Sequence, residues 1–375
     1  MILQTLDIEN NCSGIFHKGK IIYKNLKKIS EKHSVAWKHS TILDDSEYRY
    51  LYLHSKKRAL FEFSPEPENF RLYHDYMSAQ ALAAATAKID LEDMCIFDMF
   101  PERKLIKWLS LRESALQVLL DTTPCPSDYN ILHKAHVLTT DMASRRINYR
   151  GDKNSRVLYD IFGSATGRLT TRRKSAPVLT LKKEERNALT PQNDLYLEID
   201  LNGAEIRTLL ALSGKGQPEY DIHEYNMTSA ARGLTTRQEI KARFFAWLYN
   251  PEAKDYQLEK LYDKGVYKEY YEEGSVATPF GRKLLTDERK ALSYLLQSTT
   301  SDIVLENAYK IMKFLGGKKS FVAFTMHDSV VLDFSREDYH LVRDLKEVFE
   351  ENRLGRYHSR VCIGKNFGEM EELKL

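Results

Sequence analysis

The pattern of hydrophobic and polar residues divides the chain into regions of different structure. In residues 1–63, apolar and polar side chains alternate in short runs, which predict β-strands joined by polar turns. Residues 64–68 include two prolines, which interrupt regular structure and indicate a boundary. From about residue 70 to 143 the apolar spacing is helical, most clearly over residues 104–120.

The second half of the chain mixes the two patterns. Residues 195–200 alternate apolar and polar side chains, as a half-buried strand does. Thr236 is followed three residues later by Glu239, a capping box that predicts the start of a helix. Residues 287–315 predict one or two long helices, and residues 341–353 predict a last amphipathic helix.

Two further β-rich runs, 321–326 and 330–334, are separated by the polar residues His327, Asp328 and Ser329. This is the pattern of a hairpin with a polar turn. We therefore predict an α+β fold, with an antiparallel sheet in the second half and helical insertions before and within it.

Composition agrees with a folded chain of two or three subdomains. Its 375 residues are 42% hydrophobic and 11% aromatic, which excludes general disorder. The net charge of +3 neither requires nor excludes nucleic acid, because binding would depend on a local basic groove.

Cysteine usage and the N-terminal residues bear on location. The four cysteines are scattered without a CxxC pair, so we expect no structural zinc site and a reducing compartment. The chain begins without the features of a signal peptide, and no apolar stretch approaches the length of a membrane span. We expect a cytoplasmic protein with no membrane partner.

Two aspartates stand where strands end. Asp200 closes the predicted strand, and Asp328 lies in the predicted hairpin turn. Two carboxylates from neighbouring strands can hold a pair of Mg²⁺ ions for an in-line displacement at phosphorus. Each aspartate alone is equally well explained as a turn residue.

The helix predicted after Thr236 carries Arg237, Lys241, Phe245 and Tyr249 at four-residue spacing. Each step drifts by roughly 40°, so the four side chains follow one gently spiralling face. Cations near a helix N-terminus favour an anion, and the aromatics that follow suit a base or sugar. One nucleotide would satisfy both; an ordinary amphipathic helix is the alternative.

Three segments resemble the motifs of the family A (bacterial Pol I-like) DNA polymerases. Residues 200–207, DLNGAEIR, resemble motif A, DYSQIELR. The helix starting at Arg237 resembles motif B, RxxxKxxxFxxxY. Residues 327–329, HDS, resemble motif C, HDE.

Further matches stand in the family's order, so that the resemblance covers roughly residues 145–375. They are TGRLTT at 166–171, DIH at 221–223, TPFGR at 278–282, the stretch from 288 to 302 ending QSTTSD, and GKNF at 364–367. The compact form of the chain suggests a phage origin, and hence the host cytoplasm.

The resemblance implies a right-hand polymerase. The palm would comprise residues 151–213 and 277–375, the fingers 214–276, and the thumb 67–150. Residues 1–66 would form a β-containing cap or a remnant of an exonuclease domain. The implied partners are primer–template DNA and dNTPs, and the implied cofactor is a pair of Mg²⁺ ions.

The resemblance also implies roles for single residues. Asp200 and Asp328 would be the metal ligands. Arg237 and Lys241 would hold the triphosphate with His223 near its phosphates, and Lys241 would protonate the leaving pyrophosphate.

Other implied roles concern the nascent base pair and the duplex. Phe245 would pack on the incoming sugar and base, and Tyr249 would stack on the template side. Glu205 would press on the 2′ position and exclude ribonucleotides. The implied duplex contacts are Arg168, Arg289 and Gln297, with His327 beside the primer terminus.

Departures from the family pattern are concentrated at few positions. Ser329 replaces the glutamate of motif C, so we expect activity to survive with altered metal affinity. The family has an asparagine at the position of Ser293, and it has glycines at the positions of Asn250 and Ser298. These three differences bear on duplex contacts and fidelity. Phe245 in place of Tyr resembles the branch that discriminates against dideoxynucleotides.

We predict no intrinsic proofreading. About 65 residues precede the predicted thumb, too few for a complete 3′–5′ exonuclease domain. Residues 6–9, LDIE, resemble the Asp-x-Glu with which such exonucleases begin, but an ordinary strand end explains them better. A separate exonuclease or processivity subunit is an expected partner.

A basic stretch follows the predicted thumb, and the motif order favours a track for the duplex backbone over a solvated loop. Its residues are Arg145, Arg146, Arg150, Lys153, Arg156, Arg168, Arg172, Arg173, Lys174, Lys182 and Lys183.

Three rival functions remain. A single-subunit RNA polymerase would share the aspartate pair, but it needs a small residue where Glu205 stands. A polymerase-like scaffold that binds primer–template in a replisome would not need both aspartates and both cations. A metal nuclease would leave the Arg–Lys–Phe–Tyr helix without a purpose.

Overall fold

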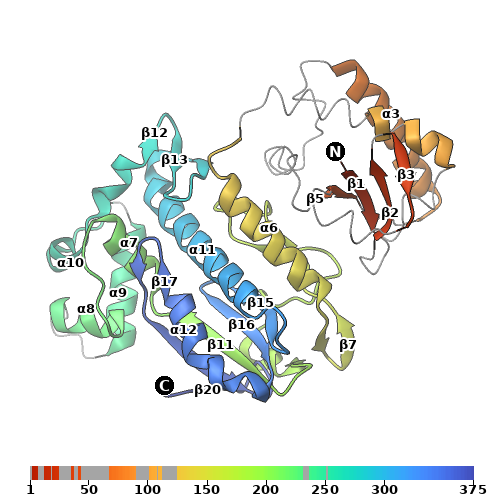
Figure 1. Ribbon diagram of the computed structural model, residues 1–375. Coiled ribbons are helices and arrows are strands. Elements are labelled where there is room, and N and C mark those ends of the chain that lie inside the picture. Colours follow the sequence, from red (N-terminus) through yellow and green to blue (C-terminus); the bar gives the residue numbers. More distant parts are fainter. Residues whose placement is uncertain are drawn as a thin grey trace. The chain divides into compact units, whose positions relative to one another are not determined.

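The computed structural model describes residues 2–6, 12–17, 19–24, 35–37, 41–43, 67–89, 101–107, 109–111, 125–230, 236–250 and 252–375. It is an α+β protein with an antiparallel sheet in its second half, as predicted (Figure 1). The chain divides into two compact units, residues 1–129 and 130–375. Over the described ranges, no helix has the length and apolar character to cross a membrane.

The first unit contains a five-stranded sheet in the order β3-β2-β1-β4-β5. β1 pairs with β2 antiparallel and with β4 parallel. The strands are β1 (Ile2–Leu6), β2 (Cys12–His17), β3 (Lys20–Ile22), β4 (Val35–Trp37) and β5 (Thr41–Leu43). Helix α3 (Pro67–Thr86) begins at a proline, whose missing amide is not needed in a first turn. Residues 7–9 of the Asp-x-Glu segment lie outside the described residues.

The second unit is built on an antiparallel sheet in the order β15-β16-β11-β19-β20. The strands are β11 (Leu195–Leu201), β15 (Phe321–Met326), β16 (Ser329–Phe334), β19 (Ser359–Gly364) and β20 (Glu371–Glu372). The predicted strand at 195–200 and the predicted hairpin are confirmed. The hairpin turn contains only His327 and Asp328, because Ser329 already pairs with Met326.

Strand β11 is paired with β16 on one side and with β19 on the other, and the register of these pairs fixes the neighbours of Asp200. Asp200 stands opposite Ser329 on β16 and opposite Arg360 on β19. Alternate residues of a strand point to opposite faces, so Leu197, Ile199 and Leu201 share the other face, where all three are buried. The face that carries Asp200 is therefore the polar one at this end of the sheet.

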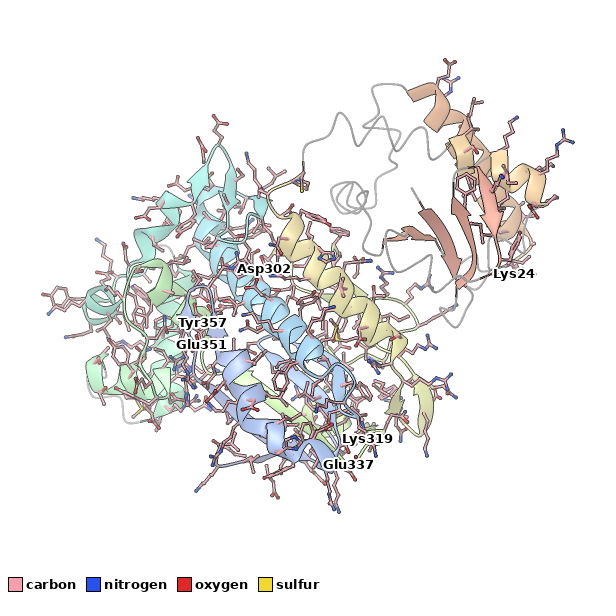
Figure 2. The ribbon with its side chains drawn as sticks, in the orientation of Figure 1. Lys24, Asp302, Lys319, Glu337, Glu351 and Tyr357 are labelled. Atoms are coloured by element: carbon pink, nitrogen blue, oxygen red, sulfur yellow. The ribbon has the colours of Figure 1, made fainter. Side chains whose placement is uncertain are left out.

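One long helix packs against the sheet. α11 (Glu288–Phe314) is a single helix and contacts β15, β16, α7 (Ala204–Leu212) and α12 (Val342–Glu350). Asp302, near its middle, is fully buried and is paired with Arg282 at 2.8 Å (Figure 2). The predicted last helix is shorter than 341–353, because residues 336–341 form a 3₁₀ turn and residues 351–352 form a strand.

A group of helices is inserted between β11 and α11. It comprises α8 (Ile222–Ala230), α9 (Arg237–Tyr249), α10 (Tyr256–Leu261) and the 3₁₀ turn η4 (Lys264–Glu269). Its apolar core includes Phe244, Trp247 and Tyr262, and the rings of Phe244 and Tyr262 lie 4.9 Å apart. The small sheet that follows, β12 (Tyr271–Glu272), β13 (Ser275–Ala277) and β14 (Lys283–Leu285), was not predicted.

The remaining elements precede or flank the main sheet. They are α6 (Tyr129–Ser144), β6 (Ile147–Tyr149), β7 (Asp152–Ser155), β8 (Tyr159–Asp160), β9 (Thr170–Thr171), η3 (Lys183–Ala188), β10 (Leu189–Thr190), η5 (Arg336–Leu341), β17 (Glu351–Asn352) and β18 (Gly355–Arg356).

Candidate active site

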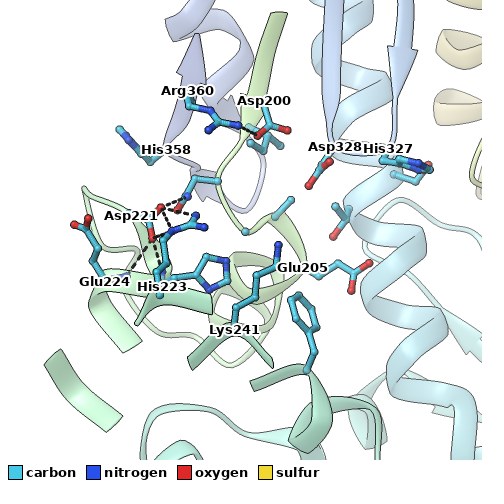
Figure 3. Close-up of a pocket in the computed structure, with 18 of the residues that line it drawn as sticks. Asp200, Glu205, Asp221, His223, Glu224, Lys241, His327, Asp328, His358 and Arg360 are labelled. Atoms are coloured by element: carbon cyan, nitrogen blue, oxygen red, sulfur yellow. Dashed lines mark hydrogen bonds and ion pairs between the residues drawn. The ribbon is translucent and has the colours of Figure 1, made fainter. Parts of the chain in front are cut away.

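A cavity of about 750 Å³ lies between the end of β11, the β15–β16 turn and helices α8 and α9 (Figure 3). Every residue predicted for the site lines it except Arg289 and Gln297. The predicted residues that line it are Arg168, Asp200, Glu205, His223, Arg237, Lys241, Phe245, Tyr249, His327 and Asp328.

Asp200 lies in β11 and Asp328 in the β15–β16 turn beside it, and both line the same cavity. The amide of Leu201 donates a hydrogen bond to the carbonyl of Asp328 at 3.1 Å, which ties the hairpin turn to the end of β11. Burial raises the pKa of Asp200 to about 7, and the nearby charges of Asp328 and Glu198 act in the same direction. The pKa of Asp328 is also raised, chiefly by burial.

This pair fits a divalent cation that takes its other ligands from a substrate. Two partly buried carboxylates that repel each other gain from a cation placed between them. Arg360 stands beside the pair, with its Nη2 3.5 Å from Oδ2 of Asp200. Within the described ranges, no three His, Cys, Asp or Glu side chains are grouped to hold a metal ion by themselves.

Helix α9 presents its predicted face to the cavity. The Thr236 hydroxyl accepts from the amide of Glu239 at 3.2 Å, and the Glu239 carboxylate accepts from the amide of Thr236 at 3.0 Å, which confirms the capping box. The ammonium of Lys241 lies 6.0 Å from the centre of the Phe245 ring. The rings of Phe245 and Tyr249 are stacked 5.9 Å apart.

Asp221 holds the basic end of α9 to the start of α8. Its carboxylate accepts from Nη2 of Arg237 at 2.8 Å and from the amides of His223 and Glu224 at 2.8 and 3.1 Å. Burial acts to raise the pKa of Asp221, but these hydrogen bonds prevail and bring it to about 2. Asp221 belongs to the DIH segment that resembles the family, but the sequence analysis assigned it no role. An aspartate directly before a helix is nevertheless a signal for a helix cap.

His223 is the buried polar side chain of the cavity. It is only 2% exposed, and its Nδ1 has no hydrogen-bond partner among the residues described. Burial, and then the charge of Arg237, lower the pKa of His223 to about 4, so the imidazole is neutral at physiological pH. A buried nitrogen without a partner, in a cavity lined by cations, suits a ligand oxygen.

Glu205 joins three segments. Its carboxylate is paired with the guanidinium of Arg168 and accepts a hydrogen bond from the hydroxyl of Tyr249. Burial, followed by the charge of Glu205, raises the pKa of Tyr249. Gln297 contacts the same hydroxyl from α11, outside the cavity. Arg289 lines a separate pocket of about 330 Å³ that also includes Tyr249.

Some residues of the site were not predicted. Arg360 lines the cavity from β19 and His358 from the residue just before that strand, and Asn202 donates to Asp221 at 2.6 Å. Asn202 is held by Arg207, which is fully buried and donates to its backbone oxygen at 2.8 Å. No local sequence signal indicates Arg360, because its position depends on the pairing of β19 with β11.

The chain is similar to solved structures, whereas sequence comparisons find no match. No family model matches the chain, and no curated protein matches it. Among solved structures, it is similar to the polymerase domain of Pol1 from M. smegmatis in complex with DNA primer-template and dNTP, with 16% identity and a TM-score of 0.47. The match covers 69% of this chain and 55% of that one, so the chain spans about half of that structure's length. A similarity this low assigns neither a family nor an activity.

Proposed function

We propose that this chain is a template-directed DNA polymerase that adds dNMPs to a primer 3′-hydroxyl and releases pyrophosphate. One observation carries the proposal: a single cavity collects the carboxylate at the end of β11, the carboxylate of the adjoining hairpin turn and an Arg–Lys–Phe–Tyr helix face. Nucleotide transfer needs carboxylates that bind metal ions, basic side chains that bind phosphates and aromatic rings that pack on a base.

Asp200 and Asp328 would hold two Mg²⁺ ions, since their oxygens are the ligands that this ion prefers. When bound, the ions would lower the pKa of the primer hydroxyl and neutralise the triphosphate. This need explains why the chain keeps two partly buried carboxylates together despite their mutual repulsion.

The helices would hold the nucleotide. Arg237 and Lys241 lie in the first turns of α9, where the helix dipole also favours an anion. The unpartnered Nδ1 of His223 would meet a phosphate oxygen, and Lys241 would give its proton to the leaving pyrophosphate. Arg237 would share its guanidinium between Asp221 and the phosphates.

Glu205 would exclude ribonucleotides. Its carboxylate is fixed by Arg168 and Tyr249 at the edge of the cavity, so it would oppose a 2′-hydroxyl with a rigid group. This contact favours the DNA polymerase over an RNA polymerase. We expect Glu205→Ala to raise ribonucleotide incorporation relative to dNTP by about 10- to 100-fold, measured as the ratio of kcat/KM values.

The larger layout is part of the same proposal. Residues 151–213 and 277–375 would be the palm, residues 214–276 the fingers and residues 67–150 the thumb. The basic stretch from Arg145 to Lys183 would follow the duplex backbone, and binding would weaken steeply with salt. The chain would rely on another subunit for proofreading.

Extension of a labelled primer–template tests the proposal. Wild type, Asp328→Ala and the matched control Asp344→Ala, whose carboxylate is exposed on α12, are compared with Mg²⁺ and either dNTPs or rNTPs. We expect extension with dNTPs only, lost in Asp328→Ala and kept in the control. A folded wild type that binds the duplex without extending it would instead favour a replisome scaffold.

A further inference from the structure

A third carboxylate lies behind the aspartate pair. Glu198 is two residues before Asp200 on β11, so the two side chains point to the same face of the sheet. Ser329 stands opposite Asp200 on β16 and is therefore on that face as well. The hydroxyl of Ser329 lies 2.9 Å from Oε1 of Glu198.

The contact involves the position at which the sequence departs from motif C. Residues 327–329 read HDS where that motif has HDE, so Ser329 cannot supply the carboxylate. The carboxylate of Glu198 reaches the side chain of Ser329 from the adjacent strand. It therefore lies beside the position from which the motif's glutamate would project.

Ser329 is only 1% exposed, so a glutamate in its place would bring a second buried carboxylate against Glu198. Glu198 acts electrostatically on Asp200 and is itself acted on by Asp328. The positive charges of Arg186 and Arg360 partly balance the negative charge of Glu198. Glu198 and Asp200 thus share one sheet face, and the charge of Asp328, in the adjoining β15–β16 turn, acts on both.

We propose that Glu198 supplies, from β11, the supporting carboxylate that motif C lacks here, placed behind the metal-binding pair Asp200 and Asp328, with Ser329 fixing its position. This rests on the proposed function. Glu198 does not line the cavity, so it is a positioning residue: its charge supports the cation-binding pair from behind. The pairing of Glu198 with Ser329 then explains how the chain dispenses with the motif's glutamate.

Binding of Mn²⁺ to the full chain, followed by electron paramagnetic resonance, tests this inference without relying on activity. The variants are Glu198→Gln, which keeps the shape and removes the charge, Glu198→Ser, and the exchange Glu198→Ser with Ser329→Glu. We expect Mn²⁺ affinity to fall about tenfold in both single variants and to recover in the exchange. Thermal unfolding of each variant, with Asp344→Ala as control, reports folding separately.

Two results would overturn the inference: wild-type Mn²⁺ affinity in folded Glu198→Gln, or an exchange that folds but binds no better than Glu198→Ser. A purely structural role would lower the unfolding temperature and leave Mn²⁺ affinity unchanged. Primer extension distinguishes the two proposals. If Asp328→Ala abolishes extension while Glu198→Gln binds Mn²⁺ normally, this inference fails and the polymerase stands. If wild type does not extend, the polymerase fails, and the Mn²⁺ titration alone decides the role of Glu198.

Discussion

The two halves of the cavity are built in opposite ways. In the sheet half, β11 is paired on both sides, so Asp200 is fixed by register and its side chain is 28% exposed. In the helix half, α9 carries exposed cations, and the side chain of Arg237 is 45% exposed. The sheet therefore holds like charges together at an energetic cost, whereas the helix offers charges that can move to a ligand.

This difference indicates how the site would work. A rigid acidic half can define where cations and a reacting hydroxyl meet, because strand register fixes its geometry. A basic half on a helix can follow the phosphates of a nucleotide as it enters. Variants in the two halves should therefore have different signatures, and the following predictions compare them.

The largest effect is expected in the sheet half. Asp200→Asn removes one of the two charges that would hold metal, so the extension rate should fall at least about a thousandfold, equivalent to about 4 kcal/mol. The unfolding temperature should stay level or rise, because the variant relieves repulsion with Asp328. Single-turnover extension and thermal unfolding measure the two quantities. Extension within tenfold of wild type would contradict the metal role.

A smaller effect is expected in the helix half. Lys241→Met should lower kcat about a hundredfold at saturating dNTP, because the variant lacks the proposed proton donor to the pyrophosphate. Its side chain is exposed, so the unfolding temperature should not change. The control is Gln238→Met, also exposed on α9. A rise in KM with unchanged kcat would show that Lys241 only binds the nucleotide.

The opposite face of α9 should affect stability and not catalysis. Arg243 donates to both oxygens of Asp255 at 2.7 Å and is 22% exposed. Arg243→Met leaves the partly buried Asp255 without its partner, and the free energy of unfolding should drop by about 2 kcal/mol. Urea unfolding measures this, and extension at low temperature should equal that of wild type. A loss of extension as large as that of Lys241→Met would contradict the division of the helix into two faces.

The smallest effect concerns pH. The pKa of His223 is about 4 in the folded chain against its ordinary 6.5, so the unfolded chain takes up the proton first. Its contribution to stability is complete above about pH 6.5 and decreases as pH falls toward 4. Between about pH 7 and pH 5.5 the loss should be about 1 kcal/mol. Urea unfolding against pH measures it, and His223→Gln should remove that part of the slope. An unchanged slope in the variant would show that another group is responsible.

Local signals in the sequence predicted the elements that carry the site. The capping box at Thr236, the alternation leading to Asp200 and the polar turn at Asp328 each specify structure within a few residues. These elements bring seven of the ten predicted lining residues to one cavity; Arg168, Glu205 and His223 come from other segments. Their roles, and the division into palm, fingers and thumb, stay predictions.

Contacts between distant segments could not be predicted in this way. The positions of Arg360 opposite Asp200 and of Ser329 against Glu198 depend on strand register, which no local pattern specifies. Arg289 and Gln297, which were expected to contact the duplex, lie outside the cavity on α11 beside Tyr249, and their role stays a prediction. The order of motifs along a chain does not determine the distances between them.

The hairpin turn has a consequence for how this protein can vary. His327, the first of its two central residues, has a φ of 54°, a left-handed conformation that costs a histidine about 1 kcal/mol and costs glycine almost nothing. A library at this position selected only for heat resistance should therefore enrich glycine. Selection for primer extension should retain a side chain that can reach the cavity. The two selections would diverge at this one codon, and their divergence would measure how much stability the chain gives up there for the proposed activity.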